Sequence, residues 1–192
     1  EGTWNNATLL QLIDRSYRTA EPATHVRVGW SPEALKLAIT RFEPKLSDIK
    51  SEVTSKNPKD DAEIHLDDSV EIFLQPEGGG AGLGFHFTVN ANGVVYDASN
   101  EVKYLGLDNK NWGSDAKVAV KKGEGIWVVE MSIPWSDLGV KNASAGQVIR
   151  TNVYRNRYAG GNLDQSSWAP MVEERHSARE NFGKWTLSAQ SE

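Results

Sequence analysis

The sequence predicts an all-β domain, a two-sheet antiparallel β-sandwich of the jelly-roll or immunoglobulin-like kind with long loops. Three observations support this fold class. Apolar and polar residues alternate with period two in most patterned segments. Signals for helices are few, and polar stretches containing glycine or proline separate the segments. The chain of 192 residues has neither an internal repeat nor a linker, so we expect residues 1–192 to form a single sandwich.

The first half of the chain contains four patterned segments. The clearest covers residues 68–74, where Val70, Ile72 and Leu74 face one way and the residues between them face the other. Strands are also predicted over residues 25–30, 34–42 and 84–90, whereas residues 9–13 fit a strand or a helix equally well. Residues 45–61 and 75–84 are polar or rich in glycine, and they predict long loops.

The second half of the chain begins with a predicted hairpin. Residues 116–120 and 126–133 flank a short segment whose glycines allow the positive φ of a tight reversal. Residues 134–139 predict one short helical turn that ends at Gly139. Residues 148–154 and 184–187 bring the total to about eight to ten strands.

Charge and composition exclude several classes of function. The net charge of −5 argues against nucleic acid or an anionic membrane as a partner, because both require clustered lysine and arginine. The absence of cysteine excludes disulfides, thiolate zinc sites and cysteine nucleophiles. The longest apolar stretches are no longer than strands, so no transmembrane segment or signal peptide is expected.

A set of polar side chains alternates away from the apolar face of the predicted strands. It contains a carboxylate, amides, a guanidinium and a phenol, which together can donate to and accept from sugar hydroxyls. A solvated outer face with no function is the alternative interpretation. The residues are Glu71, His86, Thr88, Asn90, Arg150, Asn152 and Tyr154.

Aromatic rings would supply the second half of sugar recognition, because the C–H face of a pyranose packs on a flat ring. Trp112 lies among loop-forming residues rather than on a patterned strand, so it is the candidate platform. Packing in the core is the alternative for any tryptophan. Trp127 alternates with Val129 and Met131 and is predicted to be core.

An acidic stretch predicts a calcium site. Hard oxygen ligands gathered in a loop suit this ion, and the candidates are Asp60, Asp61, Asp67 and Asp68. The stretch lacks the twelve-residue EF-hand pattern, and a solvated loop is the alternative.

Catalysis has little support in the sequence. Glu71 and Glu130 could form a glycosidase pair, but the sequence does not fix the separation on which that chemistry depends. Neither the Gly-x-Ser-x-Gly elbow nor the His-Glu-x-x-His zinc motif occurs. We therefore expect a protein that is not an enzyme.

Several blocks of the chain resemble the family 9 carbohydrate-binding modules. Their order and spacing extend over most of the sequence. They are DDSVEIFL at residues 67–74, FHFTVNANG at 85–93, WVVEMSIPWSDL at 127–138, RTNVYR at 150–155, SWAP at 167–170, HS at 176–177 and FGKW at 182–185. The resemblance implies a β-sandwich that binds glycans, often at chain ends, with structural calcium and no catalysis.

The resemblance also implies a binding site, which this chain matches in part. The family's glutamate corresponds to Glu71, whereas His65 and His176 stand near the positions of the two tryptophans that clamp the sugar. Thr88 replaces an arginine, and Trp168 belongs to a block that the resemblance makes structural. Sugar binding could therefore be moved, for instance onto Trp112, or lost. The candidate ligand contacts are Glu71, His65, Thr88, Asn90, Trp112, Arg155, Trp168 and His176.

The sequence thus predicts a module for polysaccharide or oligosaccharide, secreted or extracellular/periplasmic, and part of or companion to a larger secreted enzyme with a catalytic domain. Two alternatives remain. Similar sandwiches bind haem through methionine and histidine, and Met131, Met171 and His86 are nominal ligands. A structural or protein-docking sandwich that has lost sugar binding is the other.

Overall fold

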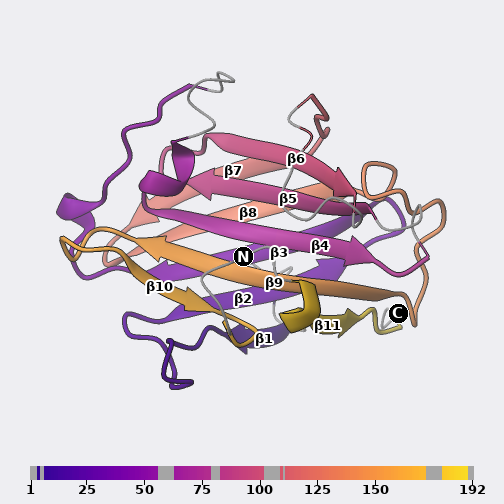
Figure 1. Cartoon of the computed structure of the whole chain (residues 1–192), viewed down its shortest axis with the longest axis horizontal. Helices are drawn as coiled ribbons and strands as arrows, with labels where there is room; N and C mark the ends of the chain where they lie inside the picture. The colour runs from indigo at the N-terminus through magenta and orange to yellow at the C-terminus, as the bar shows by residue number, and fades with distance from the viewer. Residues whose placement is uncertain are drawn as a thin grey trace.

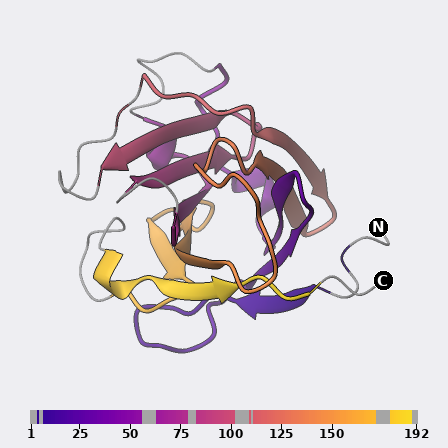
Figure 2. The same ribbon diagram turned by 90° about the vertical axis from the view of Figure 1, so that its right-hand side faces the viewer.

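The computed structural model describes residues 4, 7–55, 63–78, 83–101, 109, 111–171 and 179–189. Two antiparallel sheets pack face to face (Figure 1). In Figure 2, turned by 90°, the strands are seen more nearly end-on. The predicted all-β sandwich is confirmed. Within the part of the chain that the structure describes, no helix is long and apolar enough to span a membrane.

The first sheet has five strands in the order β1-β2-β3-β8-β7. Their bounds are β1 (Thr8–Gln11), β2 (Thr24–Trp30), β3 (Ala34–Phe42), β7 (Lys117–Gly123) and β8 (Ile126–Pro134). The ambiguous segment at residues 9–13 therefore contributes a strand. The predicted hairpin is formed by β7 and β8, and its turn is tighter than expected because β7 continues to Gly123 and Gly125 takes a φ of 68°.

The second sheet has six strands, with β10-β9-β4-β5-β6 in order and β11 paired with β9. Their bounds are β4 (Ser69–Pro76), β5 (Leu83–Asn90), β6 (Val95–Glu101), β9 (Val148–Arg157), β10 (Asp164–Ser167) and β11 (Gly183–Thr186). The short strands β10 and β11 lie one after the other along the same edge of β9 (Figure 1).

Among the described residues, the helical elements are three short 3₁₀ turns, η1 (Leu46–Asp48), η2 (Ile64–Leu66) and η3 (Arg179–Asn181). Residues 134–139 form overlapping hydrogen-bonded turns, in which the amide of Leu138 donates to the carbonyl of Trp135. This agrees with the predicted single turn, and Gly139 ends it with a φ of 68°.

The hydrophobic core lies between the two sheets. Val70, Ile72 and Leu74 of β4 share one buried cluster with Leu37 of β3 and Trp127 of β8, and all five are 0% exposed. Burial of one such aliphatic side chain stabilises the fold by roughly 1.5–3 kcal/mol. The period-two alternation of β4 therefore has a physical cause, because every second residue of the strand points into the core.

The outer face of the six-stranded sheet is covered as well. Val53 and Ile64 pack on Tyr96 and Ala98 of β6, and η2 lies against β5. Phe73 of β4 belongs to a further buried cluster on this face. The alternative interpretation of a solvated outer face therefore does not hold for β4, which is buried on both sides.

The buried charge cluster (Arg41, Glu43, Asp68, Arg155 and Arg157) joins the two sheets at one end of the sandwich. Glu43 Oε2 accepts from Arg155 Nη2 at 2.9 Å and from Arg157 Nε at 2.7 Å. Arg41 of β3 lies 3.5 Å from Asp68 and is 0% exposed. Burial lowers the pKa of Arg155 to about 10, which leaves it charged at neutral pH.

Candidate functional site

The candidate site lies at the centre of the outer face of the six-stranded sheet. β4 is flanked by β5 and β9, and the register places Glu71 between Thr88 of β5 and Tyr154 of β9. Phe73, two residues along β4, pairs with His86. Side chains two residues apart on a strand point to the same face, so this register gathers all five on one surface.

Among the described residues, Asn156 and His86 hold Glu71 in place. Asn156 Nδ2 donates to its Oε1, and His86 Nε2 lies 3.3 Å from its Oε2. His86 Nε2 also lies 3.1 Å from the hydroxyl of Thr88. The side chain of Glu71 is 7% exposed and that of His86 is 14% exposed, so the imidazole is the more accessible member of the pair.

Aromatic rings surround this carboxylate and form the ring cluster (Phe73, His86, Tyr96 and Tyr154). Phe73 and His86 are stacked, with centroids 4.1 Å apart and planes at 13°. Tyr96 meets His86 edge-on at 5.2 Å, and Tyr154 meets Phe73 in the same manner at 5.8 Å. Edge-to-face and offset rings at these distances are mutually attractive, so the cluster is rigid.

Tyr154 stays protonated in this environment. Burial raises the pKa of Tyr154 to about 12, and the nearby Glu71 charge acts in the same direction against the Asn152 hydrogen bond. Its hydroxyl oxygen accepts from Asn152 Nδ2 at 2.8 Å. Within the described part of the chain, the site thus combines the carboxylate of Glu71 with hydroxyl, amide and ring groups.

Comparison with known proteins identifies the family. A family model described as carbohydrate family 9 binding domain-like matches residues 1–190. The chain belongs to this family. Among curated proteins, none matches it significantly.

Solved structures of the same fold are similar over nearly the whole chain. A family 9 carbohydrate-binding module from Caldicellulosiruptor kristjanssonii in complex with cellotriose has a TM-score of 0.67 at 18% identity, covering 100% of this chain and 87% of that one. A family 9 module from the same organism in complex with glucose has a TM-score of 0.66 at 18% identity, covering 100% of this chain and 89% of that one. A third structure comes from a Bacteroides uniformis protein that is provisionally assigned as carbohydrate-binding. It has a TM-score of 0.73 at 18% identity, covering 96% of this chain and 88% of that one. At this identity the likeness establishes the fold.

The residues at the family's site positions are only partly brought together. Glu71 and Thr88 are cross-strand neighbours on β4 and β5. His65 is exposed on η2, where its carbonyl oxygen lies 3.4 Å from the hydroxyl of Tyr158. His176 lies outside the described residues. A sugar contact by any of these four remains a prediction.

Asn90 is committed to the protein, contrary to the prediction that it contacts a ligand. Its Nδ2 donates to the carbonyl of Val53 and to Asp67, and its Oδ1 accepts from the amides of Asn92 and Val94. It is 0% exposed. All four hydrogen-bonding positions of the amide are filled, so none is left for a sugar.

The predicted calcium ligands Asp67 and Asp68 accept from protein donors. Asp67 binds the amides of Glu52 and Val53, while Asp68 binds the amide of Lys50 and Arg41. Burial raises the pKa of Asp68. Among the described residues, no group of three or more histidine, aspartate or glutamate side chains is arranged to hold a metal. Asp60 and Asp61 lie outside the described residues, and calcium remains a prediction.

Trp112 lies on the other side of the sheet from Glu71, so the predicted pairing of these two residues is wrong. Its ring packs on Phe85 and Phe87 at centroid distances of 5.2 and 6.0 Å. These phenylalanines face the core, because they alternate with His86. The indole is therefore half-buried at the margin of the core.

Arg155 and Trp168 also have structural roles, which corrects their prediction as ligand contacts. Arg155 is 1% exposed, and its two terminal nitrogens donate to main-chain carbonyls and to Glu43. Trp168 packs against Trp185 at 5.8 Å, beside the core. Neither residue belongs to the outer face around Glu71.

The nominal haem ligands are not arranged as a pair. Met131 is 3% exposed within the core between the sheets, whereas His86 lies on the outer face. Met171 packs against Phe73 and Tyr154, but the Nε2 atom of His86 is already within 3.3 Å of Glu71. The geometry therefore gives a haem site no support.

Sequence reasoning missed three residues of the site, Phe73, Tyr96 and Asn156. Phe73 and Glu71 alternate together, so the signal for Phe73 was present but unused. Asn156 continues the alternation of Asn152 and Tyr154 beyond the predicted end of the strand. Tyr96 lies on β6, which the pattern did not reveal as a strand.

Proposed function

We propose that the chain is a non-catalytic module that binds polysaccharide or oligosaccharide on the outer face of the six-stranded sheet. The observation that carries this proposal is the Glu71–His86 pair within the ring cluster. Buried polar groups fix the orientation of a ligand, and aromatic rings supply apolar contact. Both kinds of group meet here at the position of the family's glutamate.

The chemistry of the pair follows from its geometry. The ionised carboxylate of Glu71 can only accept, so Nε2 of His86, 3.3 Å from Oε2, is the atom of the ring that donates to it. A sugar that approaches this face meets the imidazole of His86 before the carboxylate, because His86 is the more exposed of the two. Glu71 therefore acts on the ligand both as an acceptor and through the orientation of the imidazole.

The positions of Glu71 and Glu130 argue against a glycosidase pair. Glycosidase carboxylates flank one bond and lie about 5–10 Å apart. Glu71 is on the outer face of the six-stranded sheet, whereas Glu130 is exposed on the opposite outer face, where its Oε1 accepts from Trp4. Two packed sheets separate them, with a spacing of about 10 Å between the sheets alone.

A module of this kind acts by holding an enzyme or a cell surface near its polysaccharide. The proposal therefore includes a secreted or extracellular/periplasmic location and a catalytic domain as a partner. The sugar complexes of the family 9 modules suggest glucose units as the first ligands to test.

Calorimetry with cellotriose and glucose tests the proposed site. Replacement of Glu71 by Gln (Glu71→Gln) removes a charged acceptor, and hydrogen bonds to charged groups are worth roughly 1.5–3 kcal/mol. We expect Kd to rise about tenfold or more, since 1.4 kcal/mol corresponds to a factor of about ten. His86→Ala should weaken binding to a similar extent.

Glu124→Gln is the matched control, because Glu124 is exposed in the turn between β7 and β8. It should leave both affinity and melting temperature unchanged. A lowered melting temperature for Glu71→Gln with unaltered affinity would mean that Glu71 is structural. If neither Glu71→Gln nor His86→Ala changes the affinity for cellotriose, the sugar binds elsewhere on the protein.

A further inference from the structure

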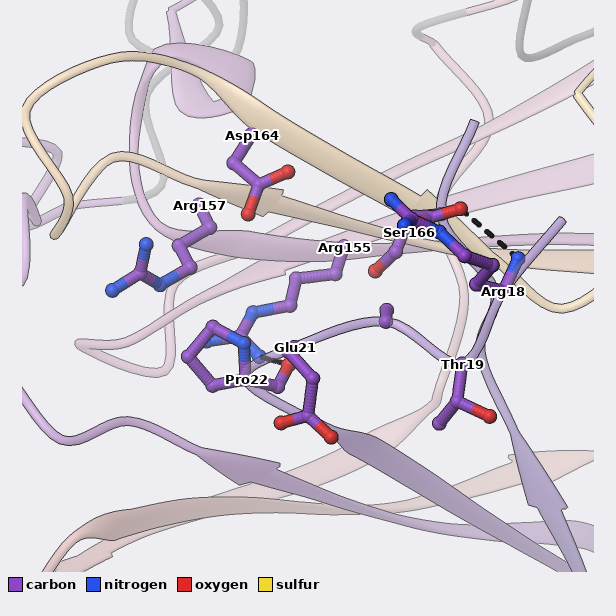
Figure 3. Close-up of a pocket in the computed structure, with 10 residues that line it drawn as sticks. Arg18, Thr19, Glu21, Pro22, Arg155, Arg157, Asp164 and Ser166 are labelled. Atoms are coloured by element: carbon purple, nitrogen blue, oxygen red, sulfur yellow. Dashed lines mark hydrogen bonds and ion pairs between the residues drawn. The ribbon is translucent and has the colours of Figure 1, made fainter. Parts of the chain in front are cut away.

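A cavity lies at the end of the sandwich, away from the ring cluster. We call it the end pocket; it opens between β9, β10 and the segment at residues 14–22 (Figure 3). Its volume is about 430 Å³, within the range of roughly 300–1,000 Å³ that is usual for small-molecule sites. Arg155 forms its floor, with Asp164 and Ser166 on one side and Glu21 on the other.

The walls of the end pocket are fixed by hydrogen bonds. Ile13 and Ser167 exchange two backbone hydrogen bonds of 2.7 and 3.0 Å, which tie the segment to β10. Arg15 Nη2 donates to Gln165 at 2.7 Å, and Arg155 Nη1 donates to the carbonyl of Pro22 at 2.7 Å. A pocket held in this way binds without the cost of ordering its own walls.

Several polar groups of the pocket are still available to a ligand. Arg157 uses Nε and Nη2 on Glu43, but its Nη1 makes no hydrogen bond to any described residue. Within the same described ranges, the hydroxyl of Ser166 and the carboxylates of Asp164 and Glu21 make no hydrogen bond or ion pair. Figure 3 shows these side chains around one opening. The pocket therefore offers donors and acceptors side by side.

The charges of the pocket do not favour an ion. The lining contains equal numbers of cationic and anionic side chains, which are Arg18, Arg155, Arg157, Asp14, Glu21 and Asp164. A ligand of either sign would meet repulsion as well as attraction. A sugar hydroxyl both donates and accepts, so a neutral polyol can use carboxylates and guanidinium together.

An open shelf adjoins the end pocket and shares Glu21 and Pro22 with it. Its volume is about 560 Å³, and it is formed around Phe42, which is 39% exposed. His25 supports the ring of Phe42 edge-on at 5.1 Å. An exposed, rigid ring of this kind suits the C–H face of a second sugar.

We infer that the end pocket and its shelf form a second saccharide site, for a neutral oligosaccharide of at least two rings. One ring occupies the polar pocket against Asp164, Arg157 and Ser166, and the next lies on Phe42. This inference goes beyond the proposed function, because it requires neither Glu71 nor the ring cluster. Two separated sites would let one module hold two stretches of chain, which raises avidity through effective concentration.

Amide chemical shifts of the ¹⁵N-labelled protein test the second site. The titrants are glucose, cellotriose, xylotriose, mannotriose and, as a charged comparison, glucuronate. We expect at least one neutral sugar to shift the amides of Gly160, Ser166 and Ala23, which line or border the end pocket and shelf. Asp164→Asn should weaken this binding about tenfold, and Phe42→Ala should weaken a trisaccharide but not glucose.

Asp115→Asn is the matched control, since Asp115 is exposed and directly precedes β7. β7 is one edge strand of the five-stranded sheet, and β1 is the other. It should change nothing, and Glu71→Gln should leave the shifts of the end pocket intact. The inference is overturned if no neutral sugar moves these amides, if only glucuronate does, or if Asp164→Asn has no effect. A response confined to amides beside Glu71 would uphold the proposed function and exclude the second site. A response confined to the end pocket would uphold the second site and contradict the proposed site at Glu71.

Discussion

Asn90 and Glu71 have the same alternation in the sequence but different roles in the structure. Asn90 gives its amide to residues 37 and 23 positions away, Val53 and Asp67, and so fastens a long loop to the sheet. Glu71 bonds across the sheet to His86, which keeps some exposure. Alternation shows which way a side chain points. It does not show which loop returns to cover that side chain.

Removal of the Asn90 amide should therefore cost stability. Asn90→Ala breaks three buried hydrogen bonds and one partly buried one, each worth about 0.5–1.5 kcal/mol, and we expect a loss of about 2–4 kcal/mol in the free energy of unfolding. Urea unfolding of the variant and the parent protein measures this loss of free energy. Asn142→Ala, at an exposed position, should stay within about 0.5 kcal/mol of the parent protein. Equal values for the two variants would contradict the structural role of Asn90.

The strands that the sequence revealed are those with a clear apolar face toward the core. β4 and β8 alternate large aliphatic residues with polar ones, so their existence and orientation were predictable. β6 was missed because its alternation is short and reversed: Asp97 and Ser99 lie beside the core residues of β5, whereas Tyr96 and Ala98 point to the outer face. Asp97 is buried, and accepts from the amide and hydroxyl of Ser114. Local polar partners of this kind leave no periodic signal.

The site was predictable to the same limited extent. The face that carries Glu71, His86 and Thr88 follows from alternation on two adjacent strands. The position of Trp112 does not, because a residue outside any strand has no periodicity to orient it. Its contact with Phe85 is decided by tertiary packing alone.

The docking of β11 depends on a glycine at its first residue. A Cβ at Gly183 would lie 2.4 Å from Cζ3 of Trp168, whose ring packs between this strand and the core. Overpacking of this kind typically costs 1–3 kcal/mol, so Gly183→Ala should lower the free energy of unfolding by about that amount. Tryptophan fluorescence should change in the native state as well. Gly113→Ala, where nothing lies within 4 Å, is the control. Identical stability of both variants would show that Trp168 can move aside freely.

At the scale of the whole molecule, the buried charge cluster joins the two sheets where the end pocket forms. Arg41 comes from the five-stranded sheet and Arg155 from the six-stranded sheet, and Glu43 accepts from the latter. Cζ of Arg41 also lies 4.0 Å from the centroid of the Trp127 ring, so the cluster is in direct contact with the hydrophobic core. Removal of one member of a buried ion pair commonly costs 3–5 kcal/mol. The cluster therefore fixes how the sheets meet at this end.

Acid should weaken the cluster through Glu43. Burial by itself would raise the pKa of Glu43, but the hydrogen bonds from Arg157 and the Lys45 amide, with the arginine charges, outweigh it and lower the pKa below the ordinary 4.5. A lowered folded-state pKa means that the ionised carboxylate stabilises the fold fully above the unfolded value and that this contribution is lost as the pH falls through the folded value. Glu43→Gln lacks the contribution, so the difference in melting temperature from the parent should be largest above the ordinary pKa of 4.5 and should shrink as the pH falls below it. The Glu43 charge also raises the pKa of Asp68, so the difference between the two proteins reports on the carboxylates of the cluster together. Calorimetric scans across this range, with Glu124→Gln as control, measure the difference; a gap that stays constant with pH would mean that Glu43 contributes packing rather than charge.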